Sequence, residues 1–224
     1  MEGRAYLRNV KLTDRKYLLS CPPMAARAKN TTPKRLPPAA RRTQLAEAAM
    51  EVAAEQGYAR LSLDDVAERA GVTRNLLYHY FPRGRLDVFL AAVERAGDEL
   101  TGDLIFDTER PVAEKLAANT MRSAEHAAGP TAAWRVARHA RAAAEPEIVA
   151  LRNRYRDAVV AGMALNHFGT EDPPPVVLIA LRAFLDYLQT ALDEWRESDV
   201  DRDAVLELLE RTLIATVVAA RAAA

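Results

Sequence analysis

Apolar residues recur at intervals of three and four along most of the chain, which is the spacing of one face of an α-helix. One such stripe runs from Leu45 to Ala53, and Gly57 follows where a helix end commonly needs a left-handed residue. Segments in which apolar and polar residues alternate, as in a half-buried strand, are rare. The pattern therefore predicts an all-α protein.

Two short helices joined by a glycine-containing turn are predicted before Pro82. Ser62 precedes LDDVAERA, and its hydroxyl can cap the free N–H groups of a helix over about 63–70. Thr73 is placed to cap a second helix over about 74–81, because Pro82 cannot continue it. This is the geometry of a helix-turn-helix, in which the second helix lies in the major groove of DNA.

The second of these helices carries side chains suited to a DNA duplex. Leu77 and Phe81 are four residues apart on one side, where they can join a small core. The residues left to project outward are Thr73, Arg74, Asn75 and Tyr78. Arginine can fork onto guanine and asparagine onto adenine, while hydroxyl groups can donate to phosphate oxygens. We therefore expect this helix to read DNA.

The segment SLDDVAERAGVTRNLLYHYF, with a helix predicted after it over about 86–100, resembles the DNA-binding domain of the tetracycline-repressor (TetR) family of transcriptional regulators. The shared features are a hydroxylated start of the first helix, an Ala-Gly-Val turn, and Leu-Tyr-x-Tyr/His-Phe in the second. The resemblance covers about residues 40–100. It implies core positions for Leu77 and Phe81. The DNA contacts that it implies are Ser62, Arg74, Asn75, Tyr78 and Tyr80.

The sequence departs from the family pattern after its Phe-Pro pair. The family usually has a polar residue and a phosphate-gripping lysine there, whereas this chain has Arg83, Gly84 and Arg85. Either arginine can supply the charge, and Gly84 can expose N–H groups to a phosphate at a helix N-terminus. Leu76 also stands where many relatives have a small or polar residue. It can contact a thymine methyl group or rest against the domain.

Charge is unevenly distributed, although the formal net charge is zero. Residues 1–37 hold nine Lys or Arg against two acids, residues 38–85 seven against six, and residues 86–224 fifteen against twenty-three. The first segment has four prolines and no periodicity, and it is predicted to be a disordered basic extension. It is either a flexible leader, with translation able to begin at Met24, or an arm that adds phosphate contacts.

The residue inventory disfavours enzymes and membrane proteins. Cys21 is the single cysteine, which excludes an internal disulfide and suits a reducing, cytoplasmic setting. The four histidines lack metal-ligand spacing, and neither a glycine-rich phosphate loop nor a nucleophile elbow is present. We therefore expect no catalytic residue, metal or cofactor. The longest apolar runs are also well short of the roughly 18 residues that a membrane helix needs.

The chain after residue 101 is predicted to form further helices, about nine in all. Two amphipathic helices close it, and the apolar face of each is either core or a contact with another chain. The resemblance implies that this pair forms a four-helix bundle with its copy in a second subunit, and on that basis we expect a homodimer. The residues expected at the interface are Leu181, Leu188, Leu192, Trp195, Leu206, Leu209, Leu213 and Val217.

The resemblance also implies a ligand cavity among the helices over about 111–168 and the start of the next helix. Aromatic, methionine and leucine walls favour a mostly apolar small molecule. The same residue types can equally fill a core. The candidate lining residues are Met121, Trp134, Tyr155, Met163, Phe184 and Tyr187.

The expected organisation is a basic extension over 1–37, a helix-turn-helix domain over 38–85, and an effector-binding and dimerisation domain over 86–224, with 86–100 as connector. The expected function is ligand-responsive regulation, most simply by a repressor that leaves a near-palindromic, double-stranded operator when a small molecule binds. A twofold pair of reading helices requires such an inverted repeat. The alternative is a constitutive helix-turn-helix protein with no effector.

Overall fold

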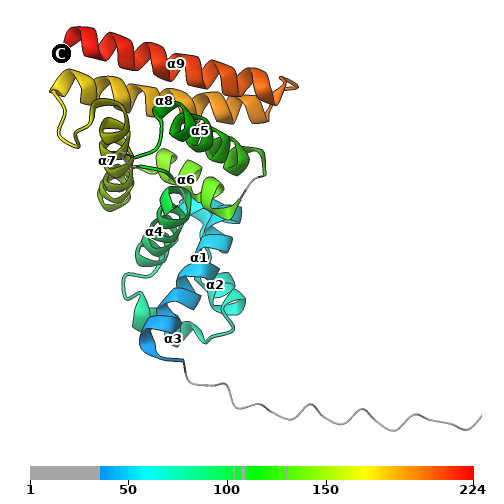
Figure 1. Ribbon diagram of the computed structural model, residues 1–224. Coiled ribbons are helices and arrows are strands. Elements are labelled where there is room, and N and C mark those ends of the chain that lie inside the picture. The colour runs from blue at the N-terminus through cyan, green and yellow to red at the C-terminus, as the bar shows by residue number, and fades with distance from the viewer. Residues whose placement is uncertain (1–35, 103, 107–108, 130) are drawn as a thin grey trace, which may run out of the picture. The chain divides into compact units, whose positions relative to one another are not determined.

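The protein is helical, without strands, over the residues that its computed structural model describes, so the all-α prediction is confirmed (Figure 1). Those residues are 36–102, 104–106, 109–129 and 131–224. The nine helices in these ranges are α1 Pro38–Arg60, α2 Leu63–Arg69, α3 Arg74–Tyr80, α4 Arg85–Gly102, α5 Val112–Ala128, α6 Ala132–Ala142, α7 Pro146–Phe168, α8 Pro175–Arg196 and α9 Arg202–Ala223. The predicted basic extension, apart from residues 36 and 37, lies outside the described residues.

Side-chain caps set the starts of α2 and α3. The Ser62 hydroxyl accepts the backbone N–H of Asp65 at 3.2 Å, and the Thr73 hydroxyl accepts that of Leu76 at 3.3 Å. These bonds satisfy N–H groups that have no partner within the helix. Both helices end within one residue of the predicted positions, α3 with Phe81 as its C-cap.

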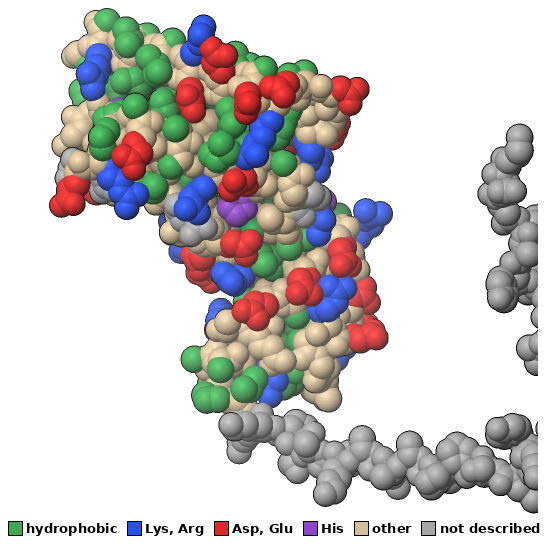
Figure 2. All heavy atoms as spheres, turned by 45° about the vertical axis from the view of Figure 1, so that its right-hand side comes forward, with side chains coloured by type: hydrophobic (Ala, Val, Ile, Leu, Met, Phe, Trp, Pro, Cys, Tyr) green, Lys and Arg blue, Asp and Glu red, His purple; other side chains and the backbone are tan. Residues whose placement is uncertain are grey.

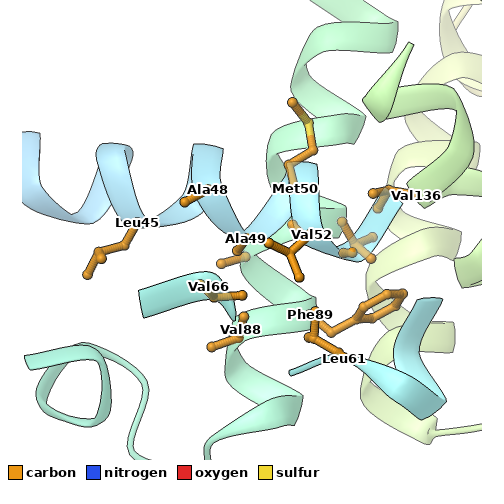
Figure 3. Close-up of a cluster of buried hydrophobic side chains, with 14 of the residues drawn as sticks. Leu45, Ala48, Ala49, Met50, Val52, Leu61, Val66, Val88, Phe89 and Val136 are labelled. Carbon is orange, nitrogen blue, oxygen red and sulfur yellow. The ribbon is translucent and has the colours of Figure 1, made fainter. Parts of the chain in front are cut away.

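The N-terminal helices share one hydrophobic core (Figure 3). Leu45, Val66 and Phe89 are fully buried in it, and Leu77 and Phe81 are almost fully buried. Helix α6 and the start of α7 also contribute to this core. Packing therefore joins the two sides of the boundary predicted at residue 85, and the division into two functional domains stays a prediction.

Close approach of α6 to α1 depends on a glycine. Gly57 has φ +67°, a conformation that side chains other than glycine rarely adopt. A Cβ atom at this position would also lie 2.9 Å from Nδ1 of His139 on α6. Gly57 therefore lets the end of α1 change direction directly beneath α6.

Helices α8 and α9 bury the apolar faces that were expected to meet a second subunit. Leu181, Leu192 and Leu209 have no exposed surface within a single chain. All eight predicted interface residues belong to, or pack against, clusters that also hold side chains of α5, α6 and α7. Six of the eight are buried in this way, whereas Leu188 and Trp195 are half-buried. The two stripes thus face neighbouring helices of their own chain, and the assignment of these residues to a dimer interface stays a prediction.

The opposite faces of α8 and α9 carry exposed apolar side chains instead. Ile179 is 67% exposed, Ile214 53% and Val218 61%. Tyr187 and Leu208 are also exposed. In Figure 2, hydrophobic side chains gather on the surface of the upper part of the view, where α8 and α9 lie. We call these five side chains the outer apolar face.

Helix α8 is, by length and composition alone, apolar enough to cross a membrane, and it is the one such helix in the described part of the chain. Its polar side chains nevertheless bind neighbouring helices. Arg182 pairs with Asp157 of α7 at 3.0 Å, and Asp193 pairs with Arg138 of α6 at 3.2 Å. These ion pairs tie α8 to the helical bundle.

Candidate nucleic-acid interface and ligand cavity

The solvent side of α3 carries the polar side chains that were expected to read DNA. Thr73, Arg74, Asn75 and Tyr78 are exposed, whereas Leu77 is buried beneath them. The burial of Leu77 and the Thr73 cap hold the short helix on α2. The result is a small surface with a guanidinium, an amide and hydroxyl groups, all of which bind base edges or phosphates.

Arg74 is held in place by its neighbours. One guanidinium nitrogen lies 2.8 and 2.9 Å from the two carboxylate oxygens of Asp64 on α2. The guanidinium also lies 5.7 Å from the centre of the Tyr78 ring. Both partners are largely exposed, so the ion pair is weak and can be exchanged for DNA. The role of Asp64 was missed because periodicity does not pair residues across a turn.

Ser62 and Tyr80 are placed differently from the exposed group. The Ser62 hydroxyl is the cap of α2, and its backbone N–H donates to Oε1 of Gln56 at 2.8 Å. Tyr80 is half-buried against the N-terminal core, and its ring contacts that of His79 edge-on. It lines a shallow groove shared with Arg83 and Glu147.

Arg83 and Arg85 are both bound to protein groups in this conformation. Nε of Arg83 lies 2.7 Å from Oδ1 of Asp87, and its Nη1 lies 3.3 Å from Oε1 of Glu147 on α7. Arg85 donates to the backbone carbonyl of Ala59 at 3.0 Å. An exchange of partners is therefore needed before Arg83 can contact a phosphate.

The glycine between these arginines has a local function. Gly84 is buried, with φ +63°, and a Cβ atom there would lie 3.5 Å from the Tyr78 ring. That distance is an ordinary contact, so it is the positive φ of the turn before α4 that favours glycine here. The guanidinium of Arg42 on α1, a residue with no sequence signal for a site, lies 5.5 Å from the Phe81 ring centre at the end of α3.

A cavity of about 450 Å³ lies among α4, α5, α6, α7, α8 and α9. Four of the six predicted residues line it: Trp134, Tyr155, Met163 and Phe184. Met121 and Tyr187 do not, and that part of the prediction was wrong. They lie on outward faces of α5 and α8, and are 38% and 37% exposed. Periodicity places a residue on a face but does not say which face is inward.

The cavity wall is more polar than expected. Its charged side chains are Lys115, Arg141, Arg152, Arg156 and Asp186. Arg141 pairs with Asp193, which is itself held by Arg138 and receives the indole N–H of Trp134 at 3.3 Å. Burial lowers the pKa of Arg141. These arginines turn inward from helices that read as amphipathic, and they add charge to a wall that is otherwise largely apolar. The expectation of a mostly apolar ligand stays a prediction.

Tyr155 connects the cavity to α4. Its hydroxyl lies 2.6 Å from a carboxylate oxygen of Asp98 and 3.0 Å from the carbonyl of Glu94. Burial and the Asp98 carboxylate raise the pKa of Tyr155 to about 12, so the hydroxyl keeps its proton at neutral pH. A Cβ atom at Gly97 would lie 2.6 Å from the ring. A cavity-lining ring is therefore packed directly on α4, which follows α3 in the chain.

No group of three or more His, Cys, Asp or Glu side chains that could hold a metal ion is found in the part of the chain that the structure describes.

Sequence comparisons match the segment that contains α2 and α3. The family model "Bacterial regulatory proteins, tetR family" matches residues 45–92, which run from α1 into α4. The curated protein "HTH-type transcriptional activator FasR" from Mycolicibacterium smegmatis (strain ATCC 700084 / mc(2)155) is 41% identical over 71 residues. That match spans about a third of each protein, 32% of this chain and 32% of the relative.

Solved structures are similar over most of the chain. A tetR-family transcriptional regulator from Streptomyces coelicolor has a TM-score of 0.68 and 22% identity, covering 84% of this chain and 85% of its own. The multidrug binding protein EbrR, solved in complex with imidazole, has a TM-score of 0.58 and 22% identity, covering 77% and 94%. At these identities the likeness shows the fold alone.

Proposed function

The chain belongs to the tetR family of bacterial regulatory proteins, and from this premise we propose that it is a ligand-gated transcriptional repressor acting as a homodimer on double-stranded DNA. The observation that carries the proposal is the exposed polar face of α3 above a buried Leu77. A regulator whose partner is DNA is expected in the cytoplasm.

Two copies of α3 are needed for a useful affinity. One helix of seven residues offers few base contacts, whereas a twofold pair doubles them and selects an inverted repeat. The outer apolar face of α8 and α9 supports such a pair, because exposed large apolar side chains are often buried in contacts between proteins. A twofold axis through this face would bring Ile214 and Val218 of both copies together.

Gating by a ligand rests on the cavity and on Tyr155. A molecule that fills the cavity can move the Tyr155 ring, and with it the part of α4 on which the ring packs. The ligand changes DNA affinity only by its difference in affinity for the two states, typically about 1–3 kcal/mol. The reported complex of EbrR with imidazole supports a small-molecule site in this fold.

Repression is the simplest outcome, because a bound dimer blocks other proteins from its operator. Activation is the alternative, and it is supported by the similarity of a 71-residue stretch of the chain to the transcriptional activator FasR. A constitutive DNA-binding protein without an effector is the third possibility. The cavity disfavours a constitutive protein, since a regulator that binds no ligand does not need a cavity.

The test starts by selecting DNA fragments that the full-length protein binds from a bacterial genome. Fluorescence anisotropy with a selected fragment then compares the protein with Arg74→Ala and Tyr78→Phe. We expect Arg74→Ala to weaken binding about tenfold or more, since one good base contact is worth about 1–3 kcal/mol. Tyr78→Phe should weaken it several-fold by removing a phosphate donor.

The matched control is Arg69→Ala. Arg69 is an arginine of the same domain, but it pairs with Glu51 and Glu55 of α1. It should change DNA affinity by less than about twofold. Equal losses for Arg69→Ala and Arg74→Ala, or no loss for Arg74→Ala in a folded dimer, would refute α3 as the reading helix.

A further inference from the structure

We propose that the effector carries an anionic group, which binds Arg152 between Arg141 and Arg156 at one end of the cavity. This inference rests on the proposed ligand gating. It names the chemical class of the ligand: an amphipathic molecule with an acidic head group, such as a carboxylate, sulfonate or phosphate, and an apolar body.

The first argument is the charge of the wall. Three arginines, Arg141, Arg152 and Arg156, line the cavity together with the single carboxylate of Asp186, among the residues that the structure describes. Asp186 lies 3.9 Å from Arg156, and Arg141 is paired with Asp193. These two arginines are therefore already matched with carboxylates.

Arg152 is different from its two neighbours. It donates to the backbone carbonyl of Arg141 at 3.3 Å and to the side-chain oxygen of Asn153 at 3.4 Å. Both acceptors are neutral, and no described carboxylate lies within ion-pair distance of it. A half-buried guanidinium without a counter-charge is destabilised. An anionic ligand would supply the missing charge.

The geometry of the arginines suits a planar or tetrahedral anion. Arg152 and Arg156 are four residues apart on α7, so they share one face of the helix. The bond from Arg152 to the Arg141 carbonyl brings the end of α6 to the same place. A guanidinium group binds a carboxylate or phosphate through two parallel N–H donors, whereas the ammonium group of lysine acts as a single point charge.

The rest of the cavity fits an apolar body with a polar far end. Leu100, Phe106, Met163 and Phe184 are among its walls. Asn166 lies ten residues after Arg156 on α7, which is about 15 Å along a helix.

The Asn166 side chain has an unused acceptor at that far end. It is 8% exposed, and its Nδ2 donates to the Ile105 carbonyl at 2.9 Å. Its Oδ1 accepts from no described group. Beside it, burial and the charges of Arg221 and Lys115 lower the pKa of His167, so the field there is positive as well. A ligand hydroxyl or N–H group fits this acceptor.

The experiment uses two fluorescent probes that share one skeleton, measured on the full-length protein. 8-Anilino-1-naphthalenesulfonate carries an anionic group, and N-phenyl-1-naphthylamine is the same skeleton without it. Titrations compare the protein with Arg152→Gln, Arg152→Lys and, as a matched control, Arg154→Gln. Arg154 is two residues away on α7, but it is exposed and pairs with Glu94 outside the cavity.

We expect Arg152→Gln to weaken the sulfonate probe about tenfold or more and the neutral probe by less than about twofold. Arg152→Lys should keep much of the sulfonate affinity, and Arg154→Gln should leave both probes unchanged. Ala137→Trp, which fills the cavity from α6, should abolish both signals and so separate the cavity from the outer apolar face. Circular dichroism of each variant shows that it is folded.

The failures are distinguishable. Binding of both probes with no selective loss for Arg152→Gln would overturn the anionic ligand and leave ligand gating standing. Sulfonate binding that survives Ala137→Trp would overturn it too, because the probe would then lie elsewhere. No cavity binding of either probe would overturn the ligand-gated function itself, and the anionic ligand with it.

Discussion

Helix α3 and the pair α8 and α9 contrast in what their two faces contain. On α3 one face is apolar and buried, and the other is polar and exposed, as Leu77 and Asn75 illustrate. On α8 and α9 both faces hold large apolar residues: Leu181 is buried and Ile179, two positions earlier, is exposed. The periodicity of apolar residues shows which residues share a face of a helix. It identifies the buried face only when the opposite face is polar.

The largest expected effect concerns the inner side of α3. Phe81→Ala should lower the free energy of unfolding by about 3–5 kcal/mol, because a fully packed ring is removed from the N-terminal core. Urea unfolding at one fixed protein concentration measures the change. Tyr78→Phe, on the outer side, should change stability by less than about 0.5 kcal/mol. Similar losses of unfolding free energy for Phe81→Ala and Tyr78→Phe would contradict the assignment of a buried and an exposed side to α3.

The next effect concerns the outer apolar face. Changing Ile214 and Val218 together to aspartate should raise the dissociation constant of the dimer at least about 100-fold, because like charges would meet across a twofold axis in a desolvated contact. Sedimentation velocity over a range of concentrations measures it. Ala158→Glu, a charge placed on an exposed position of α7, is the control and should leave the dimer intact. An undisturbed dimer in the double variant would show that another surface joins the subunits.

The smallest effect sharpens the outer side of α3. Asp64→Asn should strengthen DNA binding about two- to fivefold, because it releases Arg74 and removes a negative charge near the phosphates. Anisotropy titrations at two salt concentrations measure it, and the gain should shrink at high salt. Glu68→Gln, an exposed acid on the same helix, is the control with a smaller expected gain. Weaker binding by Asp64→Asn would mean that Asp64 orients Arg74 for its contact.

The helix-turn-helix was predictable to nearly single-residue precision. Ser62 and Thr73 mark the starts of α2 and α3 in the sequence, and the hydroxyl of each accepts the expected N-cap hydrogen bond. The inward positions of Leu77 and Phe81 follow from their spacing. These features depend on neighbours within about four residues, so the local sequence contains all the information needed.

The cavity was predictable only in part. Trp134 and Phe184 line it as expected, whereas Met121 and Tyr187 point outward. Arg152 was not selected, because an arginine on an amphipathic helix is ordinarily solvated. Its place in the wall depends on how α6, α7 and α8 pack, which periodicity does not describe.

The sequence by itself determined the helical class, the caps, the reading side of α3 and the family resemblance, because each of these is written in short-range spacing and residue chemistry. Only the tertiary structure decided what covers each apolar face and which charges meet. Arg83 finds Glu147 across 64 positions, and Tyr155 finds Asp98 across 57. Such pairings are set by the packing of whole helices, because even a partial rotation of a helix about its axis changes the partners of its side chains.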